Sequence, residues 1–319
     1  MTQAWPSPIE FGPWLLDERL GVGGTSEVWR ARHEAMPGDF AVKRLLPVSR
    51  DDAAAAERFA HEISCMQRVC HPRLPPLVAH GDVAGILWLA MPAYSGATLR
   101  RLLALGPLPV DLTLALVAEL ADGLATLHAA GLVHCDVSPD NVQVTADGEV
   151  VLLDLGIAQE MGTPSAVVGR SVPGRAAYFS PEQQARQPLD GRSDLFAMGS
   201  MLTELLTGTA PFLRSTREQT LHAVHAGELP SLTGMPASVR RLVHELLAPK
   251  AEQRCPTAAE LHRQATLLAG EPPCLRAELR ARVAALPPLV AAATWQAAEM
   301  RGEIVTDPAM DDGATVART

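Results

Sequence analysis

The sequence lacks the features that mark secreted, zinc-binding and membrane-spanning chains. Its five cysteines form no Cys-x-x-Cys pair and have no histidine at ligand spacing, so we expect reduced thiols and neither disulfides nor a zinc site. Met1–Glu10 has no basic region and no apolar core, so no signal peptide is expected. The apolar stretch Val283–Thr294 is short and is interrupted by Pro287-Pro288, which excludes a membrane span. Together these features predict a soluble cytoplasmic protein.

Basic charge is also scarce. The formal net charge is −9, which disfavours a nucleic-acid partner because such a partner needs a basic face. The apolar content of 47% favours a folded protein over a disordered one. A chain of 319 residues is long enough for two lobes with a short appendage.

The N-terminal part of the chain has the pattern of strands with one helix. The helix is predicted over Ala53–Val69, where Asp51-Asp52 supply acidic side chains that favour a helix N-terminus. Short apolar runs on either side of the helix predict the strands Trp14–Gly21, Glu27–His33, Phe40–Leu45 and Ile86–Met91.

The rest of the chain has helical periodicity. Leucines recur at spacings of four and three from Leu112 to Leu127, and Asp194–Leu206 is apolar on nearly all sides, which predicts a buried helix. More helices are predicted at Ser215–Ala226, Pro236–Leu247 and Thr257–Leu268. We therefore predict an α+β fold with a small β-rich N-terminal lobe and a larger helical C-terminal lobe. The predicted segments are an extension (1–13), the N-lobe (14–92), the C-lobe (93–270) and a helical extension with a flexible acidic tail (271–319).

The residues that could carry chemistry concentrate in two segments that follow apolar runs. They are His134-Cys135-Asp136-Val137-Ser138-Pro139-Asp140-Asn141 and Asp154-Leu155-Gly156. Phosphoryl transfer with Mg²⁺ needs one carboxylate that orients a hydroxyl nucleophile, and a carboxylate and an amide oxygen that hold the metal. Asp136, Asn141 and Asp154 provide that set. A lone Asp in a loop is more often a turn or cap residue, so the prediction depends on the whole set.

A glycine cluster, Gly21-Val22-Gly23-Gly24-Thr25-Ser26, separates the first two predicted strands. Such a turn lets backbone N–H groups lie close over phosphate oxygens, although a plain hairpin turn would have the same composition. A dinucleotide-binding turn requires a helix directly after it. Glu27–His33 has no helical apolar period, which argues against that alternative.

In their order and spacing these segments resemble those of protein kinases. From Trp14 to about Leu268 the chain is similar to bacterial Hanks-type (eukaryotic-like) serine/threonine protein kinases, with Ser26 at the third glycine of the glycine-rich loop. The resemblance implies a bilobal kinase fold. It also implies transfer of the γ-phosphoryl group of ATP, with Mg²⁺, to Ser or Thr hydroxyls of a protein substrate.

The resemblance gives roles to residues at the phosphates and the metal. Lys43 would contact the phosphates and pair with Glu62, which lies mid-helix. A lone Lys between apolar residues is otherwise usually a surface residue. Asp136 would be the catalytic residue that orients the hydroxyl, and Asn141 and Asp154 would hold Mg²⁺.

The resemblance also implies an ATP pocket. Met91 would be the gatekeeper, while the carbonyl of Pro92 and the N–H of Tyr94 would bind adenine. Gln143 would lie at the floor, where an apolar residue is usual. The full set implied to bind ATP is Gly21, Val22, Gly23, Gly24, Ser26, Val28, Ala41, Lys43, Glu62, Met91, Pro92, Tyr94 and Gln143.

Three more residues are implied to support the C-lobe. Ser180-Pro181-Glu182 matches the Ala-Pro-Glu segment of the family, and Arg254 is placed to pair with Glu182. Asp194 would accept backbone N–H bonds from the catalytic loop.

Two departures from the family pattern concern the transferring phosphate. Ser138 stands where a Lys usually contacts it, and Arg175 stands where a Thr usually bonds that Lys. We hypothesise that the guanidinium of Arg175 supplies the missing charge and is a further catalytic residue. The alternative is that Arg175 only points to solvent.

A third departure concerns regulation. Cys135 replaces an Arg that in many kinases binds a phosphorylated activation segment. We therefore expect activity that is largely independent of phosphate on Thr163, Ser165 or Ser171.

Two other functions remain open. A pseudokinase, an ATP-binding scaffold that acts through protein partners, is favoured by the departures at Ser138, Arg175, Cys135 and Gln143. A small-molecule kinase of similar fold, such as an aminoglycoside phosphotransferase, is disfavoured by the Ser180-Pro181-Glu182 segment, which supports a peptide-binding lobe.

Overall fold

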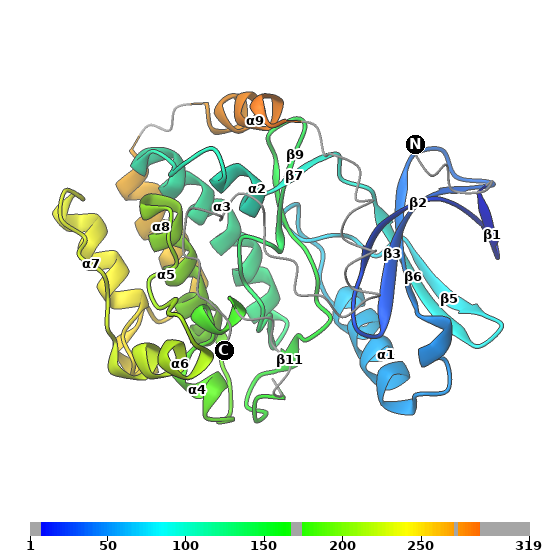
Figure 1. Ribbon diagram of the computed structural model, residues 1–319, viewed down its shortest axis with the longest axis horizontal. Helices are drawn as coiled ribbons and strands as arrows, with labels where there is room; N and C mark the ends of the chain where they lie inside the picture. Colours follow the sequence, from blue (N-terminus) through cyan, green and yellow to red (C-terminus); the bar gives the residue numbers. More distant parts are fainter. Residues whose placement is uncertain (1–7, 167–173, 271–273, 288–319) are drawn as a thin grey trace, which may run out of the picture. The chain divides into compact units, whose positions relative to one another are not determined.

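The computed structural model describes residues 8–166, 174–270 and 274–287. In this part of the chain the N-terminal lobe is an antiparallel sheet with the strand order β1-β2-β3-β4-β6-β5 (Figure 1). The strands are β1 (Ile9–Phe11), β2 (Trp14–Val22), β3 (Ser26–His33), β4 (Phe40–Leu45), β5 (Ala79–Val83) and β6 (Ile86–Pro92).

Apolar side chains cover both faces of this sheet. An aromatic cluster lies on one face, where the ring of Trp14 meets those of Phe40 and Trp88 edge-on. Helix α1 (Ala53–Gln67) buries Phe59 and Ile63 in the main core on the other face. This arrangement holds α1 against β4 and β6.

The C-terminal lobe is built around α3 (Val110–Ala129) and α5 (Gly191–Thr207). Their apolar residues are buried because other helices cover them, and α8 packs along α3. Gly208 ends α5 in the left-handed conformation that favours glycine, with φ 81°. The surrounding helices are α2 (Leu99–Leu103), α4 (Pro181–Gln184), α6 (Arg217–Ala226), α7 (Ala237–Leu246), α8 (Ala258–Ala269) and α9 (Leu275–Ala285).

Short strands carry the two chemistry-bearing segments. The sheet β10-β9-β7 consists of β7 (Gly96–Thr98), β9 (Val142–Thr145) and β10 (Val150–Leu152), and β8 (Leu132–Val133) pairs with β11 (Gln159–Glu160). Val142 lies opposite Leu152, and the N–H of Leu153 donates to the carbonyl of Asn141 at 2.7 Å. This register places Asn141 beside the start of the Asp154 segment.

The predicted α+β fold with two lobes is confirmed. The predicted strands and helices are present with small changes at their ends, whereas β1, β5, β7 to β11 and the short helices α2 and α4 were not predicted. β1 lies inside the predicted extension 1–13, and α9 lies inside 271–319. The four-segment division stays a prediction, and the acidic tail lies outside the described residues. None of the described helices has the length and apolarity needed to cross a bilayer.

Candidate active site

Lys43 on β4 and Glu62 on α1 face each other. The Nζ atom of Lys43 lies 2.6 Å and 2.9 Å from the two carboxylate oxygens of Glu62 and 2.9 Å from Oδ1 of Asp154. Glu57, the other glutamate of α1, is exposed near the start of the helix and does not take part in this contact. The side chains of Lys43 and Glu62 are largely buried, whereas that of Asp154 is 43% exposed, so one ammonium is held between a buried and a partly exposed carboxylate.

The charges of this cluster shift one another's pKa values. Burial alone would lower the pKa of Lys43, but the carboxylates of Asp154 and Glu62 outweigh it and raise that pKa. The ammonium of Lys43 lowers the pKa of Asp154 to about 2. Burial raises the pKa of Glu62, and Lys43 opposes this shift. Lys43 and Asp154 are therefore charged at neutral pH.

Asp136 lies in a second, adjoining cluster. Nδ2 of Asn141 donates to the backbone carbonyl and to Oδ2 of Asp136, each at 2.8 Å. Burial raises the pKa of Asp136, and the Arg175 guanidinium and the Asn141 bond act against this shift. The charge of Asp154 also raises that pKa, so the two clusters are close enough to interact electrostatically.

Arg175 extends toward Asp136. Its Nη1 atom pairs with Oδ2 of Asp136, and one third of its side chain is exposed. The alternative that Arg175 only points to solvent is therefore wrong. The neighbouring Ser138 is buried, and within the described residues its hydroxyl has no hydrogen-bond partner. Ser138 thus leaves room in the loop but contributes no positive charge.

Cys135 is buried, and its surroundings disfavour the reactive thiolate form. Burial, followed by the carboxylates of Asp194 and Asp136, raises the pKa of its thiol. Its backbone is in the left-handed region, with φ 68°. The thiol is therefore protonated at neutral pH, and it provides no positive charge for a phosphate.

Asp194 fixes the backbone of the catalytic loop. Its carboxylate accepts hydrogen bonds from the N–H groups of His134, at 2.8 Å, and Cys135, at 2.9 Å, as predicted. Nε2 of His128, near the end of α3, lies 2.8 Å from the same carboxylate. The sequence did not predict His128, because it lies 66 residues before Asp194 and belongs to no motif.

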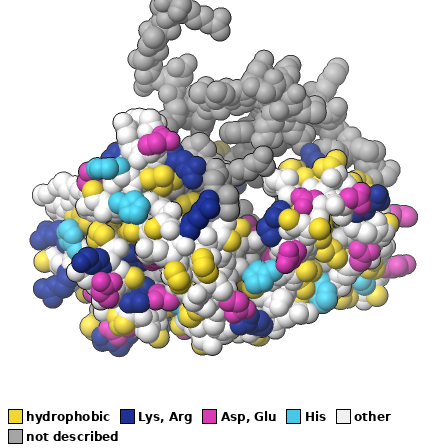
Figure 2. All heavy atoms as spheres, turned by 90° about the horizontal axis from the view of Figure 1, so that it is seen from below, with side chains coloured by type: hydrophobic (Ala, Val, Ile, Leu, Met, Phe, Trp, Pro, Cys, Tyr) yellow, Lys and Arg dark blue, Asp and Glu magenta, His cyan; other side chains and the backbone are white. Residues whose placement is uncertain are grey.

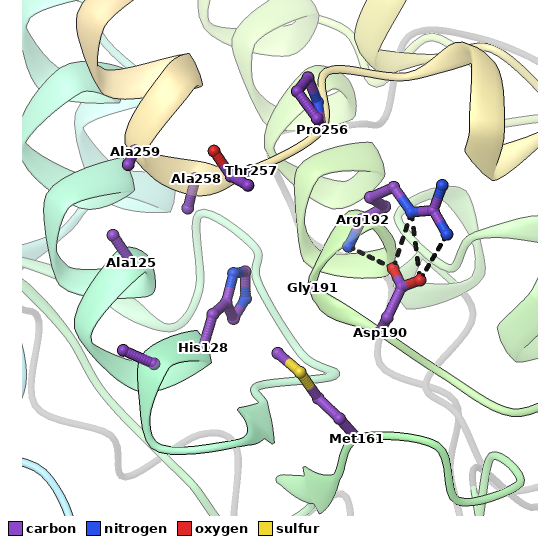
Figure 3. Close-up of a pocket in the computed structure, with 11 residues that line it drawn as sticks. Ala125, His128, Met161, Asp190, Gly191, Arg192, Pro256, Thr257, Ala258 and Ala259 are labelled. Atoms are coloured by element: carbon purple, nitrogen blue, oxygen red, sulfur yellow. Dashed lines mark hydrogen bonds and ion pairs between the residues drawn. The ribbon is translucent and has the colours of Figure 1, made fainter.

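A cavity of about 590 Å³ borders this support (Figure 3). His128 forms part of its wall, and the ion pair between Asp190 and Arg192 forms another part. Small side chains of α3 and α8, including Ala125 and Ala259, form much of the rest. The cavity lies next to His128, which contacts Asp194. None of the residues implied to act in catalysis or to bind ATP or metal lines it.

Glu182 and Arg254 form the predicted buried ion pair. The two carboxylate oxygens of Glu182 lie 2.6 Å and 2.9 Å from Nη1 and Nη2 of Arg254. The Arg254 side chain has no solvent exposure, and it also donates to backbone carbonyls. This pair ties α4 to the segment before α8.

The residues of the glycine turn that are implied to bind ATP lie where β2 leads into β3. Gly21 and Val22 end β2, Gly23 and Gly24 lie in the turn, and Ser26 begins β3. The N–H of Gly23 donates to the carbonyl of Ser26 at 2.7 Å, which closes the turn.

Strand pairing sets the register of the residues that are implied to bind adenine. Met91 on β6 lies opposite Ala41 on β4, and Val28 on β3 lies opposite Lys43. Pro92 ends β6, and Tyr94 lies in the segment that follows. Nε2 of Gln143 donates to the carbonyl of Tyr94 at 3.3 Å. This bond gives the polar floor residue a role in holding the segment after β6.

The oxygen atoms near Asp154 suit a hard divalent cation. Lys43 and the N–H of Gly156 both contact Oδ1 of Asp154, and Nδ2 of Asn141 faces Asp136. Among the described contacts, Oδ2 of Asp154 and Oδ1 of Asn141 accept no hydrogen bond, so these two oxygens remain available as metal ligands. A carboxylate and an amide oxygen are ligands that Mg²⁺ accepts together with phosphate oxygens.

Comparisons with known proteins agree with this geometry. The protein kinase domain family matches residues 14–265. Probable serine/threonine-protein kinase PkwA of Thermomonospora curvata is 34% identical over 80% of this chain and 34% of its own length. Serine/threonine-protein kinase PknH of Mycobacterium bovis is 31% identical over 79% of this chain and 43% of its own. Serine/threonine-protein kinase PknB of Mycobacterium leprae is 32% identical over 81% of this chain and 43% of its own.

The chain thus spans between a third and a half of the length of these relatives. The family match extends across both lobes and includes the Lys43 and Asp136 clusters. Members of this family generally use ATP and a divalent metal. The chain belongs to the protein kinase domain family, and the relatives named above are bacterial serine/threonine-protein kinases.

Proposed function

We propose that the protein is a serine/threonine protein kinase that transfers the γ-phosphoryl group of ATP to hydroxyls of protein substrates. The observation that carries this proposal is the position of Lys43 between Glu62 and Asp154. Phosphoryl transfer depends mainly on positioning and electrostatic stabilisation, which a fixed ammonium beside a metal-binding carboxylate supplies. The location in the cytoplasm belongs to the same proposal.

Each residue of the site has a role in this reaction. Lys43 binds the phosphates, and Glu62 holds its side chain in place. Asp136 orients the attacking hydroxyl and accepts its proton, while Asn141 keeps the Asp136 carboxylate in position. Asp154 and Asn141 hold Mg²⁺, which neutralises the charge on the phosphates when it is bound. The glycine turn covers the phosphates with its backbone.

Arg175 supplies the positive charge that Ser138 lacks. Its guanidinium contacts the carboxylate of Asp136, the residue that accepts the proton of the attacking hydroxyl. The positive charge therefore lies next to the reacting atoms. A donor fixed in that place stabilises charge that develops on the phosphoryl group. Arg175 lies between Asp154 and Glu182, in the activation segment. The charge therefore comes from this segment and not from the catalytic loop.

Surface charge supports a protein partner. On the face in Figure 2 basic and acidic side chains are interspersed and do not gather into one basic field. A nucleic-acid partner would require such a field. The ion pair of Glu182 and Arg254 keeps α4 in place beside the site, where a peptide substrate would bind.

The test is to incubate the purified protein with γ-labelled ATP and Mg²⁺ and to identify the labelled amino acids after acid hydrolysis. Labelled phosphoserine or phosphothreonine is expected, in the protein itself or in a generic protein substrate. Omission of the divalent metal should abolish the label. Exclusive phosphotyrosine would contradict the substrate class. No label with intact ATP binding would support the scaffold function instead.

A further inference from the structure

Arg68 joins three elements that the mechanism above does not connect. It follows the last residue of α1, and its Nη1 atom contacts Oε1 of Glu160 in β11, with Nη2 at 3.4 Å from Oε2. Nη2 also donates to the backbone carbonyl of Ala130, which directly follows α3. One guanidinium therefore links the end of α1, the end of α3 and β11, and Figure 1 shows β11 on the side of the lobe that faces α1.

A second contact ties the middle of α1 to the same segment. Nε2 of His61 lies 2.9 Å from the carbonyl oxygen of Ala158, which lies between Asp154 and β11. His61 directly precedes Glu62 on the helix. The helix is thus held close to the residue that pairs with Lys43 and again at its C-terminal end.

The strand β11 carries this restraint to the catalytic loop. Glu160 lies opposite Leu132, and Gln159 lies opposite Val133 in β8. β8 leads directly into His134 and the loop that contains Asp136. A shift of α1 away from the site would therefore break contacts with the strand pair that holds both catalytic segments.

We infer that Arg68 and Glu160 are positioning residues, which hold α1 where Glu62 meets Lys43 without a phosphate on the activation segment. The inference rests on the proposed kinase function and deepens its regulation. A phosphate acts in such segments by adding negative charge that basic side chains bind. The carboxylate of Glu160 provides negative charge permanently, and Arg68 already binds it with two nitrogens.

The expected effect is moderate because the pair is partly exposed. The side chain of Arg68 is 36% exposed and that of Glu160 is 47% exposed, so water and salt screen their attraction. The bond to the carbonyl of Ala130 adds to it. We expect a loss of about three- to tenfold in kcat/KM for ATP when either charge is removed, with most of it in KM.

The experiment compares Arg68→Gln, Glu160→Gln and the double variant with wild type from which all phosphate has been removed, checked by mass spectrometry. The matched control is Arg32→Gln, because Arg32 on β3 forms a partly exposed pair with Asp17 on β2 through two nitrogens, away from α1. Steady-state kcat and KM for ATP are measured, together with the thermal midpoint of each variant.

The inference expects the dephosphorylated wild type to be active. Both single variants should lose activity, Arg68→Gln at least as much as Glu160→Gln because it also loses the bond to Ala130, and the double variant should lose no more than Arg68→Gln, because the two residues act through one contact. Arg32→Gln should stay within about twofold of wild type, and the thermal midpoints should change by no more than about 2 °C.

Four results would overturn it. Either single variant with wild-type kcat/KM, or losses that add in the double variant, would show that the contact does not position α1, while the proposed function would stand. A wild type that transfers no phosphate even before dephosphorylation would remove the proposed function and this inference with it. A wild type that loses activity only on dephosphorylation would overturn the inference alone.

Discussion

Replacement of Arg175 by alanine removes the one ion-pair partner that Asp136 has among the described residues. A preorganised donor at a developing charge lowers the activation barrier by about 2.7–4 kcal/mol. Arg175 is one-third exposed, so part of this contribution is lost to screening. We therefore expect a loss of about 1.4–2.7 kcal/mol, which corresponds to a fall in kcat of about tenfold to a hundredfold.

The same variant should change the pH dependence. Burial raises the pKa of Asp136, and Arg175 acts against that shift, so its removal should raise this pKa further. Asp136 must be deprotonated to receive the hydroxyl proton, and activity is lost as the pH falls through its pKa. The acid limb of kcat/KM should therefore move to higher pH in Arg175→Ala.

The assay is initial-rate phosphorylation of a generic protein substrate at saturating ATP over a range of pH. Arg175→Lys keeps the charge and should lose less activity than Arg175→Ala. The double variant Ser138→Lys/Arg175→Thr places a cation on the catalytic loop and should recover part of the loss of Arg175→Thr. An unchanged kcat together with an unmoved acid limb in Arg175→Ala would refute the reasoning.

Two further predictions concern the C-lobe and the activation segment. Arg254→Met leaves the carboxylate of Glu182 unpaired in a mostly buried site, so the free energy of unfolding should fall by about 3–5 kcal/mol in urea titrations; a change below about 1 kcal/mol would contradict this. The triple variant Thr163→Ala/Ser165→Ala/Ser171→Ala, in which Ser171 lies outside the described residues, should keep its kinase activity. The reason is that Glu160, and not a phosphate, holds Arg68. A large loss of activity in a labelled-ATP assay would argue against this.

Much of the fold could be predicted because the long elements have strong local patterns. The leucine stripe from Leu112 predicted α3, and short apolar runs predicted β2 to β4. The strand β5 was missed because its sequence, Ala79–Val83, contains glycine and polar residues and forms only by pairing with β6. The two-residue strands β8 and β11 have no local signal, since each exists only through its partner.

The site divides in the same way. The motifs placed Lys43, Glu62 and Asp154 in roles that require contact, and the structure brings these three side chains together. The pairing of Arg68 with Glu160 could not be predicted, because the two residues are 92 positions apart and neither belongs to a motif. Such contacts depend on how the lobes pack, and the sequence pattern does not contain that information.

Asp136→Asn tests the central claim most directly, because it changes one oxygen to nitrogen and leaves the residues assigned to phosphates and metal in place. Calorimetry should give similar Mg²⁺–ATP affinity for wild type and variant. Transfer of labelled γ-phosphate should fall by about a hundredfold or more in the variant, because asparagine cannot accept the hydroxyl proton. Equal transfer rates in the two proteins, or no transfer by wild type, would contradict the account.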